Sequence, residues 1–150
     1  MTTLELIKAG IVLLWAAWLS MVTLLNVTDA LKERGRLPAT WSLASGNFAY
    51  MVEVTRIHNT PKAACWVMFV GVIIWEAIAS LLLWWALFVG TLEATNVAFL
   101  VSLALWGAFM LADEYFITYA VESEGASSVA TTHRDLFVAF LVSLVALHLL

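Results

Sequence analysis

The segment VIIWEAIASLL, Val72 to Leu82, places one carboxylate, Glu76, inside a run that is otherwise apolar. The run belongs to a longer hydrophobic block, Ala63 to Phe88. A block of this length can cross the roughly 30 Å hydrocarbon core of a bilayer as a single helix. The segment therefore predicts a membrane-spanning helix that carries an acidic side chain.

Tryptophans flank this block and indicate the depth of the carboxylate. Trp66 and the pair Trp84-Trp85 lie 18 and 19 positions apart. In a helix this spacing corresponds to about 27–28 Å, which is close to the separation of the two aromatic belts at membrane interfaces. Glu76 is therefore expected near the bilayer midplane.

The composition of the whole chain agrees with a membrane protein. Its 150 residues are 63% hydrophobic and only 12% charged, whereas soluble domains carry about 25% charged residues. The net charge of −4 gives no basic surface for nucleic acid. The single cysteine, Cys65, excludes an internal disulfide framework and a multi-cysteine metal site.

The chain contains four hydrophobic blocks of this kind in one domain, residues 1–150. A spanning segment must satisfy its own backbone polar groups, which favours helices. The sequence therefore predicts an all-α bundle of four transmembrane helices. We expect them at about Leu4–Val27, Ala63–Phe88, Asn96–Val121 and Val129–Leu150.

The three connections differ in length and character. The first is long, about Thr28 to Lys62, and its stretch Trp41–Val54 is expected to be half-buried, as a short helix in the membrane interface. The second, GTLEATN, is tight and makes the helices on either side antiparallel neighbours. The third, ESEGASSVATT, is small and polar and predicts a flexible loop.

Positive charges indicate an orientation in the cell membrane, the plasma or inner membrane. Only Lys8 lies on the side of the termini. Basic residues concentrate on the side of loops one and three, which the positive-inside rule places in the cytoplasm. They are Lys32, Arg34, Arg36, Arg56, Lys62 and Arg134.

Small side chains at four-residue spacing predict where the helices approach each other. Such residues allow close contact between membrane helices. We expect these faces to point into the bundle. They are Ala16 and Ser20 in the first helix, and Ala104, Ala108 and Ala112, with Gly107, in the third.

Glu76 has two interpretations. In the first, a hydrogen-bonded carboxyl locks helices together; in the second, it serves a proton or ion relay, because intramembrane acids often mark functional sites. Burial disfavours the charged form. We therefore expect a neutral carboxyl that faces protein and is hydrogen-bonded to Ser20, Thr23 or Ser102, or to a partner subunit.

A second group of polar residues is predicted at one membrane face. The main interpretation is an ion-pair network, with Arg134 forked onto Asp113 or Glu114. The alternative is a metal site built on His58 and His133, whose ligand types suit zinc or iron but which lacks a spaced motif. The group consists of Asn26, Asp29, Arg56, His58, Asp113, Glu114, His133, Arg134 and Asp135.

Several of these stretches resemble a group of small bacterial integral membrane proteins known only as a domain of unknown function with four predicted helices. The resemblance covers nearly the whole chain. It rests on LLNVTDAL, IIWEAIASLLLWWA, LWGAFMLADEYF and HRDLFVAF. The group's polar positions correspond here to Asn26, Thr28, Asp29, Glu76 and Glu114.

The chain departs from that group at a few positions. Asp113 and Tyr115 stand where the group tends to have glycine and tryptophan, and only Glu93 lies where the group has basic residues between helices two and three. The departure at Glu93 conflicts with the orientation given above. The resemblance implies a fold and no activity.

These observations leave two functions open. The first is a non-enzymatic accessory or structural subunit of a larger membrane complex, of the respiratory or membrane oxygenase type. The alternative is a small transporter, a proton or ion conductor, or a hydrophobic-ligand-binding protein that uses Glu76. No cofactor is predicted. The expected partners are the lipid bilayer, bound lipid, and other membrane subunits or further copies of the chain.

Overall fold

The structure is a computed structural model that describes residues 2–118 and 124–150. Every regular element within these residues is helical. In chain order they are α1 (Thr3–Glu33), α2 (Asn47–Thr55), the 3-10 turn η1 (Arg56–His58), α3 (Lys62–Val89), α4 (Leu92–Asp113), the π-helical turn η2 (Glu114–Thr118) and α5 (Glu124–Leu149).

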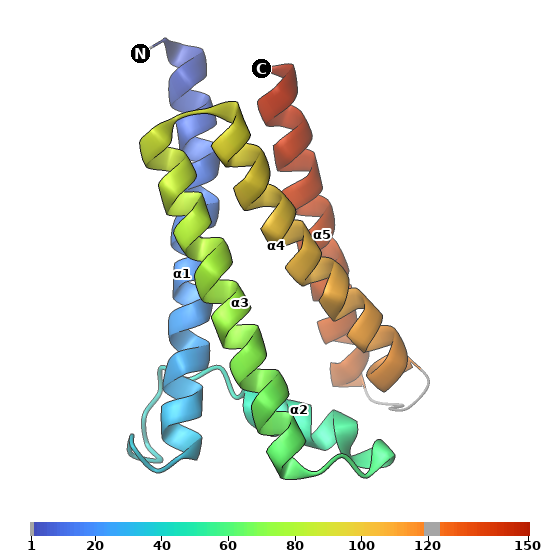
Figure 1. The fold of residues 1–150 in the computed structure, drawn as a ribbon. Helices are drawn as coiled ribbons and strands as arrows, with labels where there is room; N and C mark the ends of the chain where they lie inside the picture. The colour runs from blue at the N-terminus through green and yellow to red at the C-terminus, as the bar shows by residue number, and fades with distance from the viewer. Residues whose placement is uncertain (1, 119–123) are drawn as a thin grey trace.

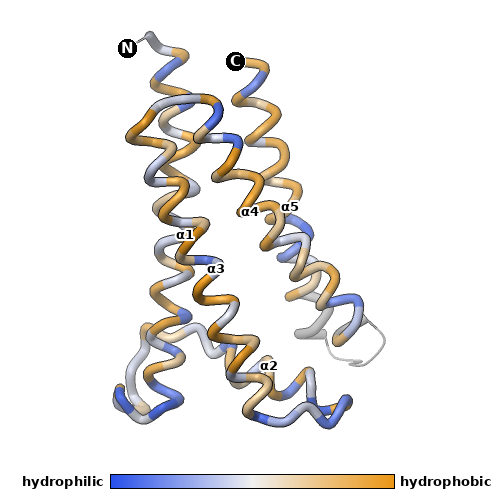
Figure 2. The backbone as a smooth tube through the Cα atoms, viewed as in Figure 1, coloured by the Kyte–Doolittle hydropathy of each residue, from blue (hydrophilic) through white to orange (hydrophobic). Residues whose placement is uncertain are grey.

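Four of these helices are long and apolar enough to cross a membrane: α1, α3, α4 with the start of η2, and α5. This confirms the predicted four-helix membrane bundle. The residues of the four helices are mostly hydrophobic, and hydrophilic residues lie mainly at the helix ends and in the connections (Figure 2). Both termini lie at the same end of the bundle (Figure 1).

Three helix boundaries differ from the predicted ones because caps, rather than hydrophobicity, end helices. α1 continues past Val27 to Glu33, and the chain turns at Gly35 with a φ of +69°. α4 begins at Leu92, because Thr91 caps it by accepting a hydrogen bond from the backbone N–H of Ala94 at 3.3 Å. α5 begins at Glu124, so the described part of the expected flexible loop is helical. The predicted end of the third helix, Val121, lies outside the described residues.

The turn between α3 and α4 sets the shape of the bundle. α3 ends at Gly90, whose φ of +70° favours glycine, and α4 starts two residues later. From this turn the two helices diverge as an inverted V, with α1 beside α3 and α5 beside α4 (Figure 1). The short helix α2 lies across the wide end (Figure 1).

A second pocket, of about 490 Å³, is lined by Ala9, Val12 and Ala86, among others, in the half of the bundle near this turn. The helices lie closest together in this half (Figure 1), and we call it the closed half. It comprises residues 3–20, 80–89, 92–102 and 143–149, and the remainder, with α2, is the open half. Small buried side chains fill the seams of the closed half: Ala16, Ala86, Ala94 and Ala98. Close approach of this kind is how membrane helices gain packing energy.

Several polar side chains of the closed half bond to one another across helices. The Ser20 and Ser80 hydroxyls lie 2.7 Å apart, and Trp84 Nε1 donates to Ser20 Oγ at 3.0 Å. Trp15 Nε1 donates to Ser143 Oγ at 2.9 Å and ties α1 to α5. These contacts confirm that Ala16 and Ser20 face the interior.

The predicted small face of α4 is only partly correct. Ala108 and Ala112 are half-buried, but Ala104 is exposed. A row of residues at four-residue spacing turns by roughly 40° per step around a straight helix, so one row cannot stay in a single interface. Trp106 of α4 is buried in the core.

Candidate functional site

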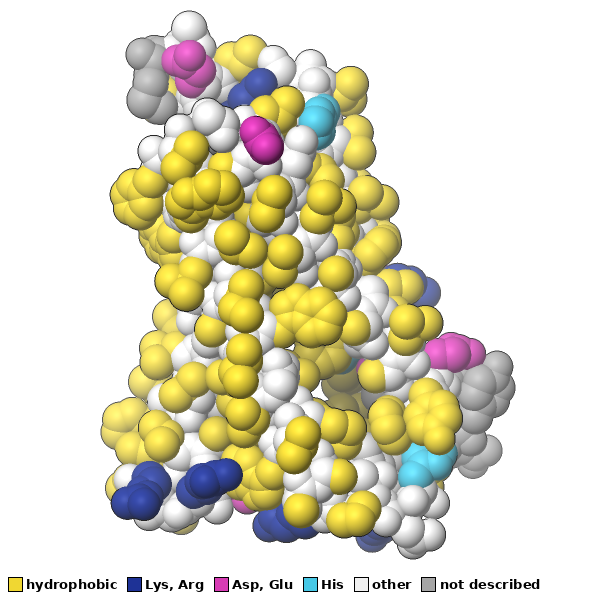
Figure 3. Space-filling view, viewed as in Figure 1, with side chains coloured by type: hydrophobic (Ala, Val, Ile, Leu, Met, Phe, Trp, Pro, Cys, Tyr) yellow, Lys and Arg dark blue, Asp and Glu magenta, His cyan; other side chains and the backbone are white. Residues whose placement is uncertain are grey.

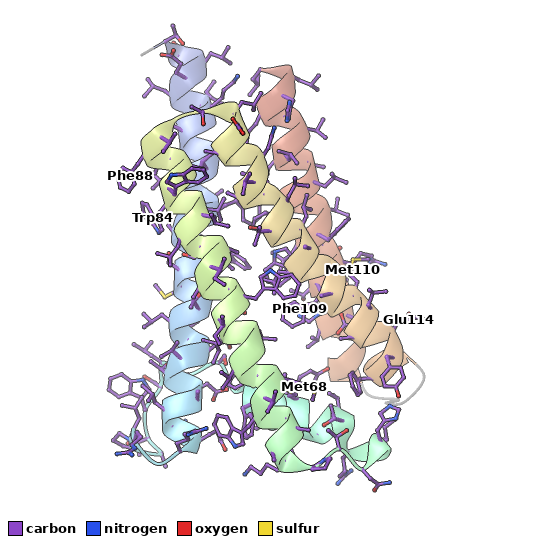
Figure 4. The ribbon with its side chains drawn as sticks, viewed as in Figure 1. Met68, Trp84, Phe88, Phe109, Met110 and Glu114 are labelled. Atoms are coloured by element: carbon purple, nitrogen blue, oxygen red, sulfur yellow. The ribbon has the colours of Figure 1, made fainter. Side chains whose placement is uncertain are left out.

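A cavity of about 500 Å³ occupies the open half, where α3 and α4 diverge above α2. Figure 3 shows a hollow at this position, and in Figure 4 Met68 and Phe109 point into the space between the two helices. Most of its lining is apolar. The aromatic part of the lining consists of Trp18, Tyr50, Phe69, Trp75, Trp106, Phe109 and Phe116.

Glu76 lies in the wall of this cavity and is 2% exposed. Asn26 on α1 donates from its Nδ2 to both carboxyl oxygens, at 2.9 and 2.8 Å. Asn47 on α2 in turn donates from its Nδ2 to Asn26 Oδ1 at 2.9 Å. The prediction that Glu76 faces protein and is hydrogen-bonded is confirmed, and the chain of contacts joins three helices.

The partners predicted for Glu76 within the chain are wrong. Thr23 and Ser102 each donate to the carbonyl four residues earlier in their own helix, at 2.8 and 2.9 Å. Ser20 is bonded to Ser80 and to Trp84 in the closed half. Short hydroxyl side chains within helices commonly bond to their own backbone in this way, and the longer amide of Asn26 reaches the carboxyl instead.

Asp29 positions Asn47 because its carboxylate caps the N-terminus of α2. The N-cap of α2 is Gly46, with a φ of +76° and no side chain to satisfy the first N–H groups. Asp29 Oδ2 accepts from the Phe48 backbone N–H at 2.9 Å and from Ser45 Oγ at 3.2 Å. A carboxylate at a helix N-terminus is favourable for both capping and the helix dipole. Asp29 is therefore a positioning residue.

Asp113 and His133 form a second polar pair on the opposite wall. His133 Nδ1 lies 2.7 Å from Asp113 Oδ2, and the imidazole ring stacks on Phe109 with centroids 4.5 Å apart. The expected fork of Arg134 onto Asp113 is wrong. Arg134 Nε lies 3.8 Å from Asp135 Oδ1, and its side chain is 62% exposed, because adjacent helical residues point roughly 100° apart.

Two buried polar atoms of lining residues, the Tyr50 hydroxyl and Trp106 Nε1, have no hydrogen-bond partner in the described part of the chain. Burial, and then the carboxylates of Asp113 and Glu53, raise the pKa of the Tyr50 phenol above its usual value. Tyr50 therefore remains a neutral hydroxyl at pH 7. Unsatisfied buried polar atoms are rare in proteins and often mark the place of a water or ligand.

The other residues of the predicted polar group lie outside the cavity. His58 stacks on Tyr115 and contacts Phe116, with ring centroids 4.9 and 5.3 Å apart, and so joins η1 to η2. Arg56 and Glu114 are exposed. Within residues 2–118 and 124–150, no three His, Cys, Asp or Glu side chains are grouped so that they could hold a metal ion.

Asn47, Tyr50 and Trp106 were not predicted as site residues from the sequence. The signal for the first two was present, because GNFAYM places Asn47 and Tyr50 three positions apart, on one face of a helix. Trp106 gave no such signal, since a tryptophan in an apolar block can face lipid, a partner or the core.

Fold and site together define an all-helical protein with four helices suited to span a membrane and a cavity with a buried carboxyl in its wall. Comparison with protein-family models, curated proteins and solved structures gave no match. The resemblance to the four-helix bacterial group therefore stays a prediction.

Proposed function

We propose that this multi-pass membrane protein binds a small hydrophobic molecule in the cavity of its open half. The observation that carries the proposal is the cavity itself, whose volume of about 500 Å³ lies in the range of ligand sites. Its walls combine many aromatic rings with a few polar groups, which is the usual composition of such sites. A ligand would enter from the lipid phase of the cell membrane, with α2 on the cytoplasmic side.

Two alanines on α4 provide a test position inside the cavity and a control position outside it. Ala108 lines the cavity, whereas Ala104, one turn earlier, is exposed. Replacing either by phenylalanine adds the same bulk to the same helix. Ala108→Phe therefore fills part of the cavity, and Ala104→Phe is its matched control.

Binding can be followed with N-phenyl-1-naphthylamine, a neutral hydrophobic fluorophore, on the protein in lipid nanodiscs. Trp18, Trp75 and Trp106 line the cavity, so excitation of tryptophan reports bound probe by energy transfer. Empty nanodiscs give the blank. We expect a saturable signal in the wild type and in Ala104→Phe that is lost in Ala108→Phe. A signal that never saturates, or is equal in both variants, contradicts the proposal.

The role of a subunit in a larger membrane complex is a second candidate. It is supported by α5, which packs mainly on α4 and presents Val138, Leu141, Val142 and Val145 outward. These side chains suit a partner helix as well as lipid. Gentle solubilisation from native membranes followed by mass spectrometry tests this role: a stoichiometric partner supports it, and the chain alone or as a homo-oligomer argues against it.

A further inference from the structure

We infer that the ligand of this cavity is a hydrophobic organic cation and that Glu76 is its counter-ion. This inference rests on the proposed function, since it names the chemical class of the molecule bound there.

The lining of the cavity contains acidic side chains but no lysine or arginine of the described residues. The two carboxyl side chains are those of Glu76 and Asp113. Asp113 contacts His133. Glu76 contacts a neutral amide, Asn26, and has no basic side chain of the described residues within 4 Å. A buried carboxylate without a positive partner is costly, and a cationic ligand supplies that partner.

The aromatic walls suit the same ligand. Trp18, Trp106 and Phe109 follow one another, with centroids 5.8 Å apart for the first pair and 5.5 Å for the second. The faces of aromatic rings carry partial negative charge and attract cations, most strongly where water is excluded. The same rings provide the apolar contacts that the hydrophobic groups of the ligand need.

Hydrogen bonds fix the Glu76 carboxyl in the wall of the cavity, where it can contact a bound molecule. Asn26 fixes both oxygens, and Asn47 and Asp29 fix Asn26 through the start of α2. A neutral carboxyl in the empty cavity is compatible with this role, because a bound cation takes the place of the proton, which is released to solvent. An anionic ligand would find no positive partner beyond His133 in the described lining.

The experiment compares two ions of the same shape and opposite charge, tetraphenylphosphonium and tetraphenylborate. Each is used to displace N-phenyl-1-naphthylamine from the wild-type protein in nanodiscs, with empty nanodiscs as the blank. We expect tetraphenylphosphonium to displace the neutral probe at concentrations at which tetraphenylborate does not. This comparison needs no variant, so it decides the proposal even if a substitution impairs folding.

Variants then assign the effect to Glu76. In Glu76→Gln we expect roughly tenfold weaker displacement by tetraphenylphosphonium, as for loss of a buried charged partner, after correction for the affinity of the same variant for the neutral probe. Glu93→Gln, an exposed acid at the start of α4, is the control and should match the wild type. Phe109→Leu should weaken the cation about threefold, and Phe88→Leu, at an exposed site (Figure 4), should not.

The outcomes separate this inference from the proposed function. Equal displacement by the two ions, or an unchanged tetraphenylphosphonium affinity in a Glu76→Gln variant that still binds the neutral probe, overturns the cationic ligand and leaves the cavity as a hydrophobic site. Absence of any saturable probe binding to the wild type overturns both.

Discussion

The closed and open halves of this bundle are built from the same four helices and differ in what lies between them. In the closed half, alanines bring the helices together, and serine and tryptophan side chains bond to one another. In the open half, aromatic rings and the Glu76 carboxyl line a cavity where α3 and α4 diverge (Figure 1). The two halves thus differ in which side chains line the helix interfaces.

The largest expected effect tests whether the two halves respond differently to added volume. Ala98→Leu inserts three carbon atoms into the closed half, where Ala98 is fully buried, and should cost about 3 kcal/mol in the free energy of unfolding. Ala108→Leu adds the same atoms beside the cavity and should be nearly neutral. Thermal unfolding in detergent measures both, and equal losses would show that the open half is as tightly packed as the closed half.

The second expected effect concerns the polar chain that spans the open half. Asn26→Leu removes the donor to both oxygens of Glu76 and the acceptor of Asn47, which should cost about 2 kcal/mol for groups left buried and unsatisfied. The double variant with Glu76→Leu should recover part of that loss, and Glu76→Gln alone should assemble normally.

Asn96→Leu provides the control for this prediction. Asn96 Oδ1 also has a polar contact between helices, 2.8 Å from His148 Nε2, but that contact is exposed. Its loss should be small. If Asn26→Leu and Asn96→Leu lower the melting temperature equally, the hydrogen bonds around Glu76 do not stabilise the open half.

A third effect separates two neighbouring residues of α5. His133→Ala removes the partner of Asp113 and a ring stacked on Phe109, and should cost about 1 kcal/mol. Arg134→Ala alters an exposed pair and should stay within about 0.5 kcal/mol of the wild type. A larger loss for Arg134→Ala in the same melting experiment would restore the arginine fork that the sequence suggested.

The smallest effect returns to the closed half. Trp84→Phe keeps most of the ring but removes the hydrogen bond to Ser20, and hydrogen bonds between membrane helices contribute about 0.6 kcal/mol on average. Trp85→Phe changes a half-exposed neighbour and should be neutral. Urea or detergent titration can resolve this difference. A larger loss of stability for Trp84→Phe than for Asn26→Leu would show that the hydrogen bond in the closed half contributes more than those around Glu76.

The fold could be predicted because hydrophobic length is a strong local signal. The four spans and the buried position of Glu76 follow from blocks of about 20 apolar residues and from the cost of exposing a charge to lipid. Caps are weaker signals, so the end of α1 and the starts of α4 and α5 were misplaced.

The site could be predicted only in part, because partners depend on the rotation of each helix about its axis. Asn26, Asp29, Asp113 and His133 were singled out, but as one cluster at one membrane face rather than as three separate contacts. Asn26 reaches Glu76 since α1 and α3 are antiparallel and in register at that level, which hydropathy does not report. The neutral state of Glu76 at pH 7 stays a prediction.

The two-residue turn at Gly90 and Thr91 also bears on how the protein is made. Helices this closely joined leave little chain to place between them, so α3 and α4 are expected to enter the bilayer together as a helical hairpin. Chains emerge from the ribosome from the N-terminus, so α1 with Asn26 precedes α3 with Glu76. The amide partner of the carboxyl has therefore already been synthesised when α3 enters the membrane, and we expect Asn26 to be available to Glu76 at that stage.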